Sequence, residues 1–544
     1  MTIWKIFKNG ATKNHQILAR SIISSLQPVT NVKKQTTAEL IISYCSAFPD
    51  KVALIDDARN IKYKFSDVKN SIHAIASALT KNGVGKGTIA GIIASNSPEY
   101  LLLIYALSSI GCVVTACNHN YTQGEMKYQL MHSNPSILFA SEECLGKVSE
   151  TASKLSNVKD IYVIGNRIPG YKSVEDLMVD SGNMSPIGQL ELNLDKDLAI
   201  LPYSSGTSGL PKGVMLTHSN FVSSNKQLEM THESKESDSY MLILPMYHVY
   251  GMICIPNFLF GLGLPAVVQP KFDPVKMLTA IEKYKVAVLH LIPPLVLFLL
   301  NHPKVDQFDL SSVRKTVCGA ASLDQQLENR LIEKFKVKNP DFFTTQGYGL
   351  TETCGVSHLT PIGNDHNKKL GSIGQLVSGV DCKIVDIERR QELPSGEIGE
   401  ILLRGPNIMK GYYQNTSETL NSFEDGWFKT GDLGYYDSDH YFYISGRLKE
   451  LIKVKGFQVA PAELEATLLM FPGITDCAVI GIPDERFGEV PKAFIVTTKE
   501  IDSSEIHSFI ESHLSDIKHL KGGIEFVNEI PKSPSGKILR KLLK

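Results

Sequence analysis

Apolar and polar residues alternate along most of the chain with the two periods that distinguish helices from strands. Residues 71–79 carry apolar side chains at helical spacing and predict an amphipathic helix, and the apolar run 99–110 predicts a buried one. Residues 88–93 and 112–115 are short apolar runs typical of buried strands. Further strands are expected at 198–201, 240–244, 266–268, 286–292 and 316–318. This alternation favours an α/β fold of parallel sheets covered by helices.

The pattern changes from about Gly379 onward. Short strands at 382–385, 398–403 and 441–444, separated by glycine turns, predict a β-rich subdomain. A charged stretch and then a compact βα pattern of about a hundred residues, a usual domain size, follow it. We therefore expect three parts: a basic tail at 1–38, a large domain at 39–445, and a small α+β domain at 446–544.

The most apolar run, residues 286–300, is short of the ~20 residues of a membrane-spanning helix. It contains Pro293 and Pro294, so we interpret it as a strand up to residue 292 followed by a helix that begins at the prolines. No membrane span is therefore expected.

Composition and charge exclude several classes of protein. The 544 residues carry a formal net charge of -1, which gives no electrostatic footprint for nucleic acid. Nine cysteines occur without a C-x-x-C pair, which indicates buried thiols of a reducing compartment and no metal cluster. The oligomeric state is not readable from these features.

The N-terminal tail has no acidic residue before residue 39, and its basic residues are Lys5, Lys8, Lys13, Arg20, Lys33 and Lys34. Leu18, Ile22 and Leu26 recur at helical spacing. This composition resembles a mitochondrial targeting peptide, and a basic, poorly packed tail of a cytoplasmic protein is the alternative. The C-terminal residues 541–544 are not an S-K-L type peroxisomal signal.

The strongest candidate for chemistry is the loop YSSGTSGLPKG at residues 203–213. Consecutive hydroxyls and glycines leave backbone N–H groups free to converge on an anion, and Lys212 adds a positive charge. The loop is not a Walker A motif, because G-x-x-x-x-G-K-[ST] is absent. By composition alone, a flexible Ser/Gly loop remains an alternative.

Six further strings follow in order: LPMYHVYG (244–251), CGAASL (318–323), TTQGYGLTET (344–353), WFKTGDLG (427–434), GRLKELIKVKGFQ (446–458) and PKSPSGK (531–537). Each has an ordinary structural explanation when it is taken alone. An aromatic-flanked His is usually a packed core residue. An Asp in a Gly-containing turn is common, and a basic stretch is usually a solvated loop.

Together, the loop and the strings resemble the adenylate-forming superfamily, which includes acyl-CoA synthetases, 4-coumarate–CoA ligases and beetle luciferases. The resemblance extends over nearly the whole chain from about residue 38. It implies a large N-terminal domain, a small mobile C-terminal domain and an active site between them. Two departures from the family pattern are Ser322, where Pro is frequent, and Gly446, where many relatives have Asp at the hinge.

The resemblance also assigns roles to residues of this chain. ATP and AMP would be bound by Ser204, Ser205, Gly206, Thr207, Ser208, Gly209, Lys212, Gly319, Ala320, Ala321, Gln346, Gly347, Tyr348, Gly349, Thr351, Asp432, Arg447, Lys449, Lys453 and Lys537. The acyl substrate would contact His248, Tyr250, Gly251, Gly347 and Val356, coenzyme A would contact Lys455, Gly456, Phe457 and Gln458, and Mg²⁺ would be held by Thr207 and Glu352. Lys537, His248 and Glu352 would be the catalytic residues.

The resemblance implies an ATP-dependent acid–CoA ligase. Such an enzyme forms an acyl-adenylate and pyrophosphate, and then a CoA thioester and AMP. The acid is expected to be a fatty acid or a 4-coumarate-like aromatic acid. A luciferase-like oxidative enzyme and a non-catalytic nucleotide-binding protein are the alternatives.

Overall fold

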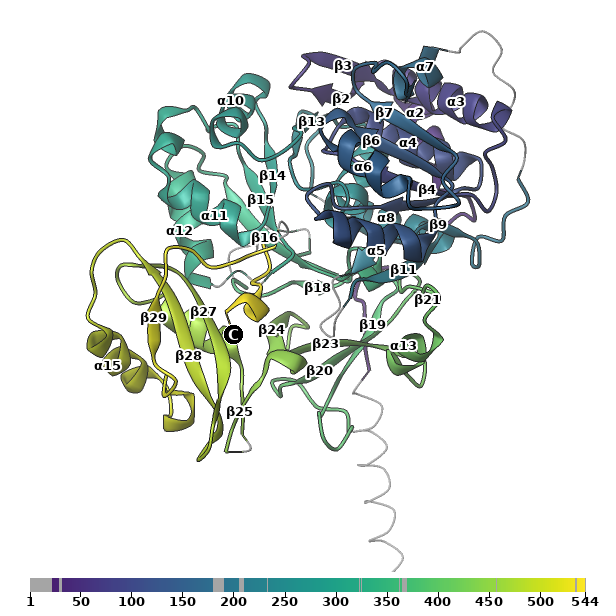
Figure 1. Cartoon of the computed structure of the whole chain (residues 1–544). Coiled ribbons are helices and arrows are strands. Elements are labelled where there is room, and N and C mark those ends of the chain that lie inside the picture. The colour runs from purple at the N-terminus through teal and green to yellow at the C-terminus, as the bar shows by residue number, and fades with distance from the viewer. Residues whose placement is uncertain are drawn as a thin grey trace, which may run out of the picture.

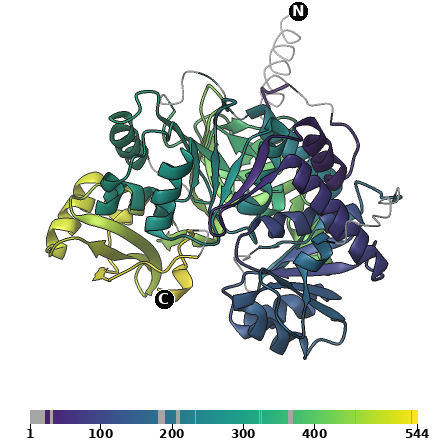
Figure 2. The ribbon, with the colours of Figure 1, turned by 90° about the horizontal axis from the view of Figure 1, so that it is seen from above.

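The computed structural model describes residues 22–28, 32–179, 190–204, 210–231, 233–321, 323, 325–361, 363, 369–455, 457–533 and 536–543. Two helix-covered sheets lie side by side, a β-rich sheet lies next to them, and a small C-terminal unit lies beside the first sheet (Figure 1). Seen from above, this C-terminal unit lies against the teal elements of the chain and away from the blue ones (Figure 2). The predicted α/β architecture is confirmed.

The first sheet carries most of the site. Its strand order is β18-β17-β16-β15-β14-β12-β13-β2-β3, and the strands from β16 to β2 are parallel. Because parallel strands end at the same edge, the turns after β14, β15 and β16 are brought together. The bounds are β2 (Val52–Asp56), β3 (Ile61–Lys64), β12 (Tyr240–Leu242), β13 (Ala266–Val268), β14 (Val288–Leu291), β15 (Lys315–Cys318), β16 (Phe343–Tyr348), β17 (His358–Leu359) and β18 (Gln375–Leu376).

Helices α10 (Pro274–Tyr284), α11 (Pro293–Asn301) and α12 (Gln325–Lys336) follow strands of this sheet. The predicted switch from strand to helix at the prolines is confirmed, because α11 begins at Pro293. Proline suits this position, since the first helical N–H groups have no partner within the helix.

The second sheet has the order β10-β11-β9-β5-β4-β6-β7-β8, in which β9 to β8 are parallel and β21 (Gly411–Tyr412) pairs with β11. Its strands are β4 (Ile89–Ile93), β5 (Val113–Ala116), β6 (Ile137–Ser141), β7 (Asp160–Ile164), β8 (Lys172–Ser173), β9 (Leu198–Ile200), β10 (Tyr203–Ser204) and β11 (Lys212–Thr217). The helices of this part are α2 (Thr37–Ala47), α3 (Phe65–Lys81), α4 (Pro98–Ser109), α5 (Gln123–Ser133), α6 (Leu145–Ala152), α7 (Val174–Val179), α8 (His218–Thr231) and α9 (Pro256–Leu262).

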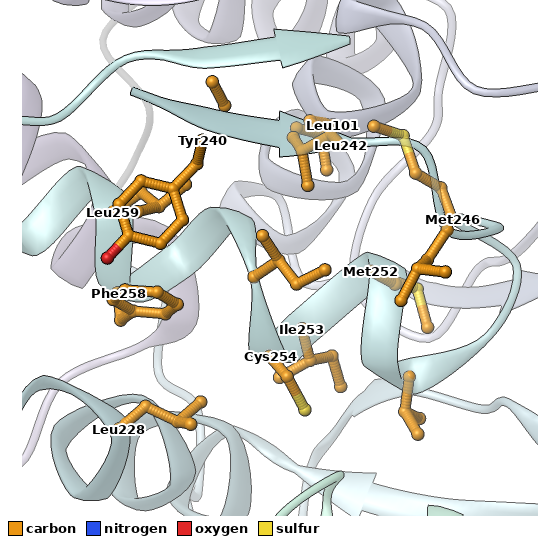
Figure 3. Close-up of a cluster of buried hydrophobic side chains, with 14 of the residues drawn as sticks. Leu101, Leu228, Tyr240, Leu242, Met246, Met252, Ile253, Cys254, Phe258 and Leu259 are labelled. Atoms are coloured by element: carbon orange, nitrogen blue, oxygen red, sulfur yellow. The ribbon is translucent and has the colours of Figure 1, made fainter. Parts of the chain in front are cut away.

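One continuous apolar core joins the two sheets. Every residue of α4 is buried, which explains its lack of a polar face. The π-helical turn η3 (Tyr250–Cys254) leads into α9, and Figure 3 shows Met252, Ile253 and Cys254 of this turn among the core side chains. A π-helical turn is wider than an α-turn and often occurs at functional sites.

The β-rich sheet is built from β19 (Asp381–Val385), β20 (Gly399–Arg404), β22 (Phe423–Glu424), β23 (Trp427–Tyr436) and β24 (Phe442–Arg447), with α13 (Thr416–Asn421) beside it. It also contains β1 (Ile23–Ser24), which pairs antiparallel with β19. Ile23 is buried, so the segment predicted as a tail at 1–38 contributes to the fold from residue 22. A strand of the β-rich sheet therefore lies within the segment 1–38.

The C-terminal unit has a sheet and a core of its own. The order is β26-β25-β28-β27, and β29 pairs with β28. Its elements are β25 (Ile452–Val454), β26 (Phe457–Val459), β27 (Ile474–Asp484), β28 (Gly488–Thr497), β29 (Ile524–Phe526), α14 (Pro461–Leu468) and α15 (Ser503–His513). None of the helices in the described ranges is long and apolar enough to cross a membrane.

Candidate active site

Lys537 reaches from the C-terminal unit to the edge of the first sheet. The neighbouring Gly536 packs closely on the start of α11, since a Cβ atom added to it would lie 3.1 Å from Cδ of Pro294. Burial, and then the nearby charge of Arg447, lower the pKa of Lys537 below its ordinary value, while Asp432 and Glu352 raise it. The ammonium therefore lies among residues of three different predicted motifs.

Asp432 on β23 is the centre of a polar cluster. Tyr348 Oη donates a hydrogen bond to Asp432 Oδ2 at 2.6 Å, and Arg447 Nε lies 3.0 Å from Asp432 Oδ1. Asp432 is buried, and β23 pairs with β24 at Asp432 and Arg447. The cluster joins the turn after β16 to the last strand before the C-terminal unit.

Glu352 is fixed by its neighbours. Its backbone carbonyl accepts a hydrogen bond from Met409 N at 2.8 Å, and its Oε1 accepts one from Tyr412 Oη at 2.9 Å. The residue is buried, so its carboxylate faces protein on most sides. Thr207, its predicted partner as a metal ligand, lies outside the described residues.

Lys212 lies near the end of the predicted phosphate loop 203–213 and begins β11. Its ammonium forms an ion pair with Glu418 of α13 and lies 5.1 Å from the ring centroid of Tyr412. Ser204 ends β10 on the other side of the loop. Ser205, Gly206, Thr207, Ser208 and Gly209 lie outside the described residues, so their predicted role stays a prediction.

The turn after β15 is held against β16 by Gln346. Gln346 Oε1 accepts a hydrogen bond from Leu323 N at 3.1 Å, and Gln346 Nε2 donates to Leu323 O at 2.8 Å. Ala320 has φ 69°, a left-handed conformation that costs energy for a residue with a Cβ and often marks a functional turn. Gly319, Ala320 and Ala321 thus lie near Gly347, Tyr348 and Gly349, as predicted for one binding surface.

A cavity of about 10 Å³ lies at the same edge. It is lined by Leu244, Pro245, His248, Tyr250, Gly251, Ile292 and Ala320. Three of the predicted acyl residues, His248, Tyr250 and Gly251, are therefore brought together. The lining also includes Leu244, Pro245, Ile292 and Ala320, and it does not include the predicted Gly347 and Val356, whose acyl role stays a prediction.

His248 is a neutral imidazole in this setting. Burial, and then the charge of Lys537, lower its pKa to about 3. Its Nδ1 accepts a hydrogen bond from Tyr250 N at 3.3 Å, so the ring proton is on Nε2. His248 can therefore donate a hydrogen bond to a carboxylate but cannot offer it a positive charge.

The predicted nucleotide-binding residues Lys449 and Lys453 and the predicted coenzyme A segment 455–458 do not join the cluster around Asp432 and Lys537. Lys449, Lys453, Lys455, Phe457 and Gln458 are exposed, and Gly456 lies outside the described residues. Lys455 Nζ lies 4.6 Å from the ring centroid of Phe487, within the C-terminal unit. In this arrangement Lys537 is at the polar cluster around Asp432, and the β25–β26 hairpin is exposed at the edge of the C-terminal unit (Figure 1).

Several residues of the site have no signal in the motifs. Tyr412 and Glu418 lie at least 60 positions from the residues that they contact, Glu352 and Lys212. Asn96 holds the loop that carries His248, because it donates to Leu244 O and accepts from Met246 N. Only the tertiary structure brings such pairs together.

Known proteins share both the sequence and the fold. Residues 43–413 match the profile of the AMP-binding enzyme family, and residues 463–537 match the AMP-binding enzyme C-terminal domain. A probable 4-coumarate–CoA ligase 3 of Dictyostelium discoideum is 36% identical, over 97% of this chain and 98% of its own length.

Solved structures of other proteins have a similar fold over most of the chain. An anthranilate CoA ligase in complex with anthranoyl-AMP superposes with a TM-score of 0.84 at 26% identity, covering 94% of this chain and 96% of that one. The ATP-bound MatB of Rhodopseudomonas palustris has a TM-score of 0.83 at 28% identity and covers 94% of this chain and 98% of its own.

Proposed function

Because the chain belongs to the AMP-binding enzyme family and is an acid–CoA ligase of the 4-coumarate–CoA ligase type, we propose that it makes CoA thioesters in two steps. The first step joins the carboxylate of the acid to the α-phosphate of ATP and releases pyrophosphate. In the second step the thiol of coenzyme A attacks the acyl carbon, and AMP leaves. The observation that carries this proposal is the electrostatic interaction of the buried Lys537 with Asp432, Glu352 and His248.

In the first step, the side chains act mainly through charge and position. His248 donates its Nε2–H to the acid carboxylate and orients it. Lys537 and Arg447 offset the negative charge that develops on the α-phosphate, which is most effective when the charges are in place beforehand. Asp432 accepts hydrogen bonds from the ribose hydroxyls, and Tyr348 packs on the adenine. When ATP binds, Lys212 leaves its ion pair with Glu418 and binds a phosphate oxygen instead.

The residues present fit the Mg²⁺ that the family implies. Mg²⁺ prefers oxygen ligands, keeps several waters and often binds through one carboxylate and the substrate phosphates. Glu352 supplies such a carboxylate, and Tyr412 holds only one of its two oxygens. In the described residues no group of three or more His, Cys, Asp or Glu side chains could form a complete metal cage, which agrees with a metal shared with ATP. When bound, the ion would offset phosphate charge.

The second step requires a different face of the C-terminal unit. Lys449, Lys453 and the hairpin residues Lys455, Phe457 and Gln458 are exposed here, and they would reach the adenylate only after this unit rotates. Such a rigid-body change is a known way to use one site for two reactions. Gly446 is the proposed pivot.

For the substrate we propose an acid with an apolar body, either an aromatic propenoate or a fatty acid. The cavity beside His248 is lined mostly by apolar side chains, and the similar Dictyostelium protein is named a 4-coumarate–CoA ligase. Screening free acids with ATP and coenzyme A, with AMP and thioester both quantified, tests this. Thioester formation supports the ligase, whereas light or an oxidised product without thioester would support the luciferase-like alternative.

A further inference from the structure

Helix α5 lies beside β11 (Figure 1), and two of its side chains hold the β10–β11 hairpin that carries Lys212. Tyr128 and His132 are four positions apart, so they lie on one face of α5. Tyr128 Oη donates to Pro211 O at 3.3 Å, and His132 Nδ1 lies 2.7 Å from Tyr203 Oη. Pro211 directly precedes Lys212, and Tyr203 begins β10. The helix therefore contacts both arms of the hairpin.

His132 is at the centre of a cluster of aromatic rings. Its ring centroid lies 6.2 Å from that of Tyr128, 5.8 Å from that of Tyr203 and 5.8 Å from that of Tyr413. The residue after the lysine of the hairpin, Gly213, pairs with Tyr203 and packs closely on the same cluster. A Cβ atom added to Gly213 would lie 3.3 Å from Cζ of Tyr203 and 3.3 Å from Cβ of Tyr413. The backbone is therefore held on both sides of the lysine.

The contact between His132 and Tyr203 is a hydrogen bond between neutral groups. Burial raises the pKa of the Tyr203 phenol, so the phenol keeps its proton. Burial lowers the pKa of His132 below its ordinary value, so the imidazole is mostly neutral at pH 7. Tyr203 can then donate to Nδ1 while the ring proton is on Nε2, and Ser133 is a second hydrogen-bond partner of the phenol. One such bond is a small part of the stability of a large domain, so variants that lack it should fold.

We propose that His132 is a positioning residue for ATP binding, because it holds the hairpin where Lys212 can reach a phosphate oxygen. The inference rests on the proposed function. A lysine has a long, flexible side chain, and a backbone that is fixed in advance reduces the entropy lost when the ammonium binds its ligand. The acid should be unaffected, since His248 follows a strand of the first sheet and α5 belongs to the second.

The test is the KM for ATP in adenylate formation by the full-length enzyme, measured together with the KM for the best acid of the substrate screen. His132→Phe keeps an aromatic ring and removes the hydrogen bond, so we expect the KM for ATP to rise about three- to tenfold, the usual effect of one hydrogen bond. The KM for the acid and the rate of thioester formation from its added adenylate stay at the parent values. Tyr203→Phe removes the same bond from the other partner and raises the KM for ATP at least as much. Met131→Ala, at an exposed position of α5, is the matched control and changes neither KM.

A double variant shows whether His132 acts through Lys212. Lys212→Ala raises the KM for ATP by itself, and His132→Phe added to it should cause no further rise, because the position of the missing side chain no longer matters. A further rise by the same factor overturns the proposal.

A parent KM for ATP in Tyr203→Phe, or a KM for the acid that rises by the same factor as that for ATP, also overturns the role of His132. If the parent enzyme forms no adenylate with any acid, the proposed function itself fails. Equilibrium titration with ATP and Mg²⁺ in the absence of acid then decides the role of His132. A three- to tenfold higher Kd in both His132→Phe and Tyr203→Phe supports it, and parent Kd values refute it.

Discussion

Lys537 is the residue on which the two proposed half-reactions should differ most. We expect Lys537→Ala to slow adenylate formation by roughly 10²–10³-fold, the usual loss for one preorganised charge donor. Thioester formation from added acyl-adenylate should stay near the parent rate. Single-turnover assays of each half-reaction measure this, with the exposed Lys541→Ala as the matched control. Equal losses in both half-reactions would contradict the assignment.

The charge on Lys537 also predicts a pH dependence. Its pKa is lowered, so the ammonium loses its proton at a lower pH than the ordinary 10.5. Adenylate formation should therefore fall on the alkaline side with an apparent pKa below that value, and Lys537→Arg should remove this limb. His248, with a pKa of about 3, should contribute no inflection between about pH 5 and 8. A His-like inflection that vanishes in His248→Ala would refute the neutral imidazole.

Glu352 should affect the Mg²⁺ requirement. Glu352→Gln keeps an oxygen that can accept the hydrogen bond from Tyr412 but removes the charge. We expect a higher Mg²⁺ concentration for half-maximal adenylate formation, because Mg²⁺ prefers charged oxygen ligands. Tyr412→Phe is the control, since it removes the hydrogen bond and keeps the carboxylate. Superimposable Mg²⁺ titrations of Glu352→Gln and the parent would show that Glu352 is not a ligand.

Among the elements, β24 is the last strand of the β-rich sheet before the C-terminal unit, so its backbone conformation affects the orientation of this unit. In the described arrangement, in which Lys537 is at the polar cluster around Asp432, Gly446 in this strand has φ 151°. Proline at this position would fix φ near roughly −65° and oppose this arrangement. We therefore expect Gly446→Pro to impair adenylate formation and to spare thioester formation from added adenylate.

Gly446→Ala should have a milder effect of the same kind. Its Cβ would lie 3.4 Å from Cβ of Ala460, an ordinary contact, so backbone strain is its main cost. Single-turnover rates of both half-reactions provide the comparison. If Gly446→Pro leaves both rates at the parent level, the C-terminal unit does not pivot at this residue.

At the scale of the whole molecule, the first residues of the described chain tie the N-terminus to the β-rich sheet. Ile23 is buried, Ser25 N donates to Val380 O at 3.1 Å, and Ser378 Oγ donates to Pro28 O at 2.6 Å. Deleting residues 1–28 should lower the thermal midpoint by roughly 5 °C, because it removes one buried isoleucine and several hydrogen bonds. Deleting residues 1–21 should leave the midpoint and the activity unchanged.

The same pair of deletions tests the targeting hypothesis for the basic tail. If residues 1–21 contain the signal, the shorter deletion should move a tagged protein out of mitochondria while its thermal midpoint stays the same. An unchanged distribution of the shorter deletion would count against a targeting peptide in this segment. A lower thermal midpoint in the deletion of residues 1–21 would show that residues before β1 also stabilise the fold.

The sequence alone predicted the α/β fold class and the positions of several helices and strands. Apolar periodicity is a local property, so the strands at 266–268 and 316–318 and the helix at Pro293 are found close to where they were predicted. The resemblance of the motifs to the adenylate-forming superfamily also predicted that residues of separate motifs meet at one site. Tyr348, Asp432 and Arg447 do lie together.

Other features depend on contacts between distant segments, which no local pattern records. The sequence placed Ile23 in a basic tail, whereas the structure pairs it with β19. Glu418 looks like a solvated helix residue until the structure shows its ion pair with Lys212. Periodicity and motif chemistry thus determined the elements and the reaction class. The tertiary structure decided the partners, because burial and hydrogen bonding are properties of the assembled core.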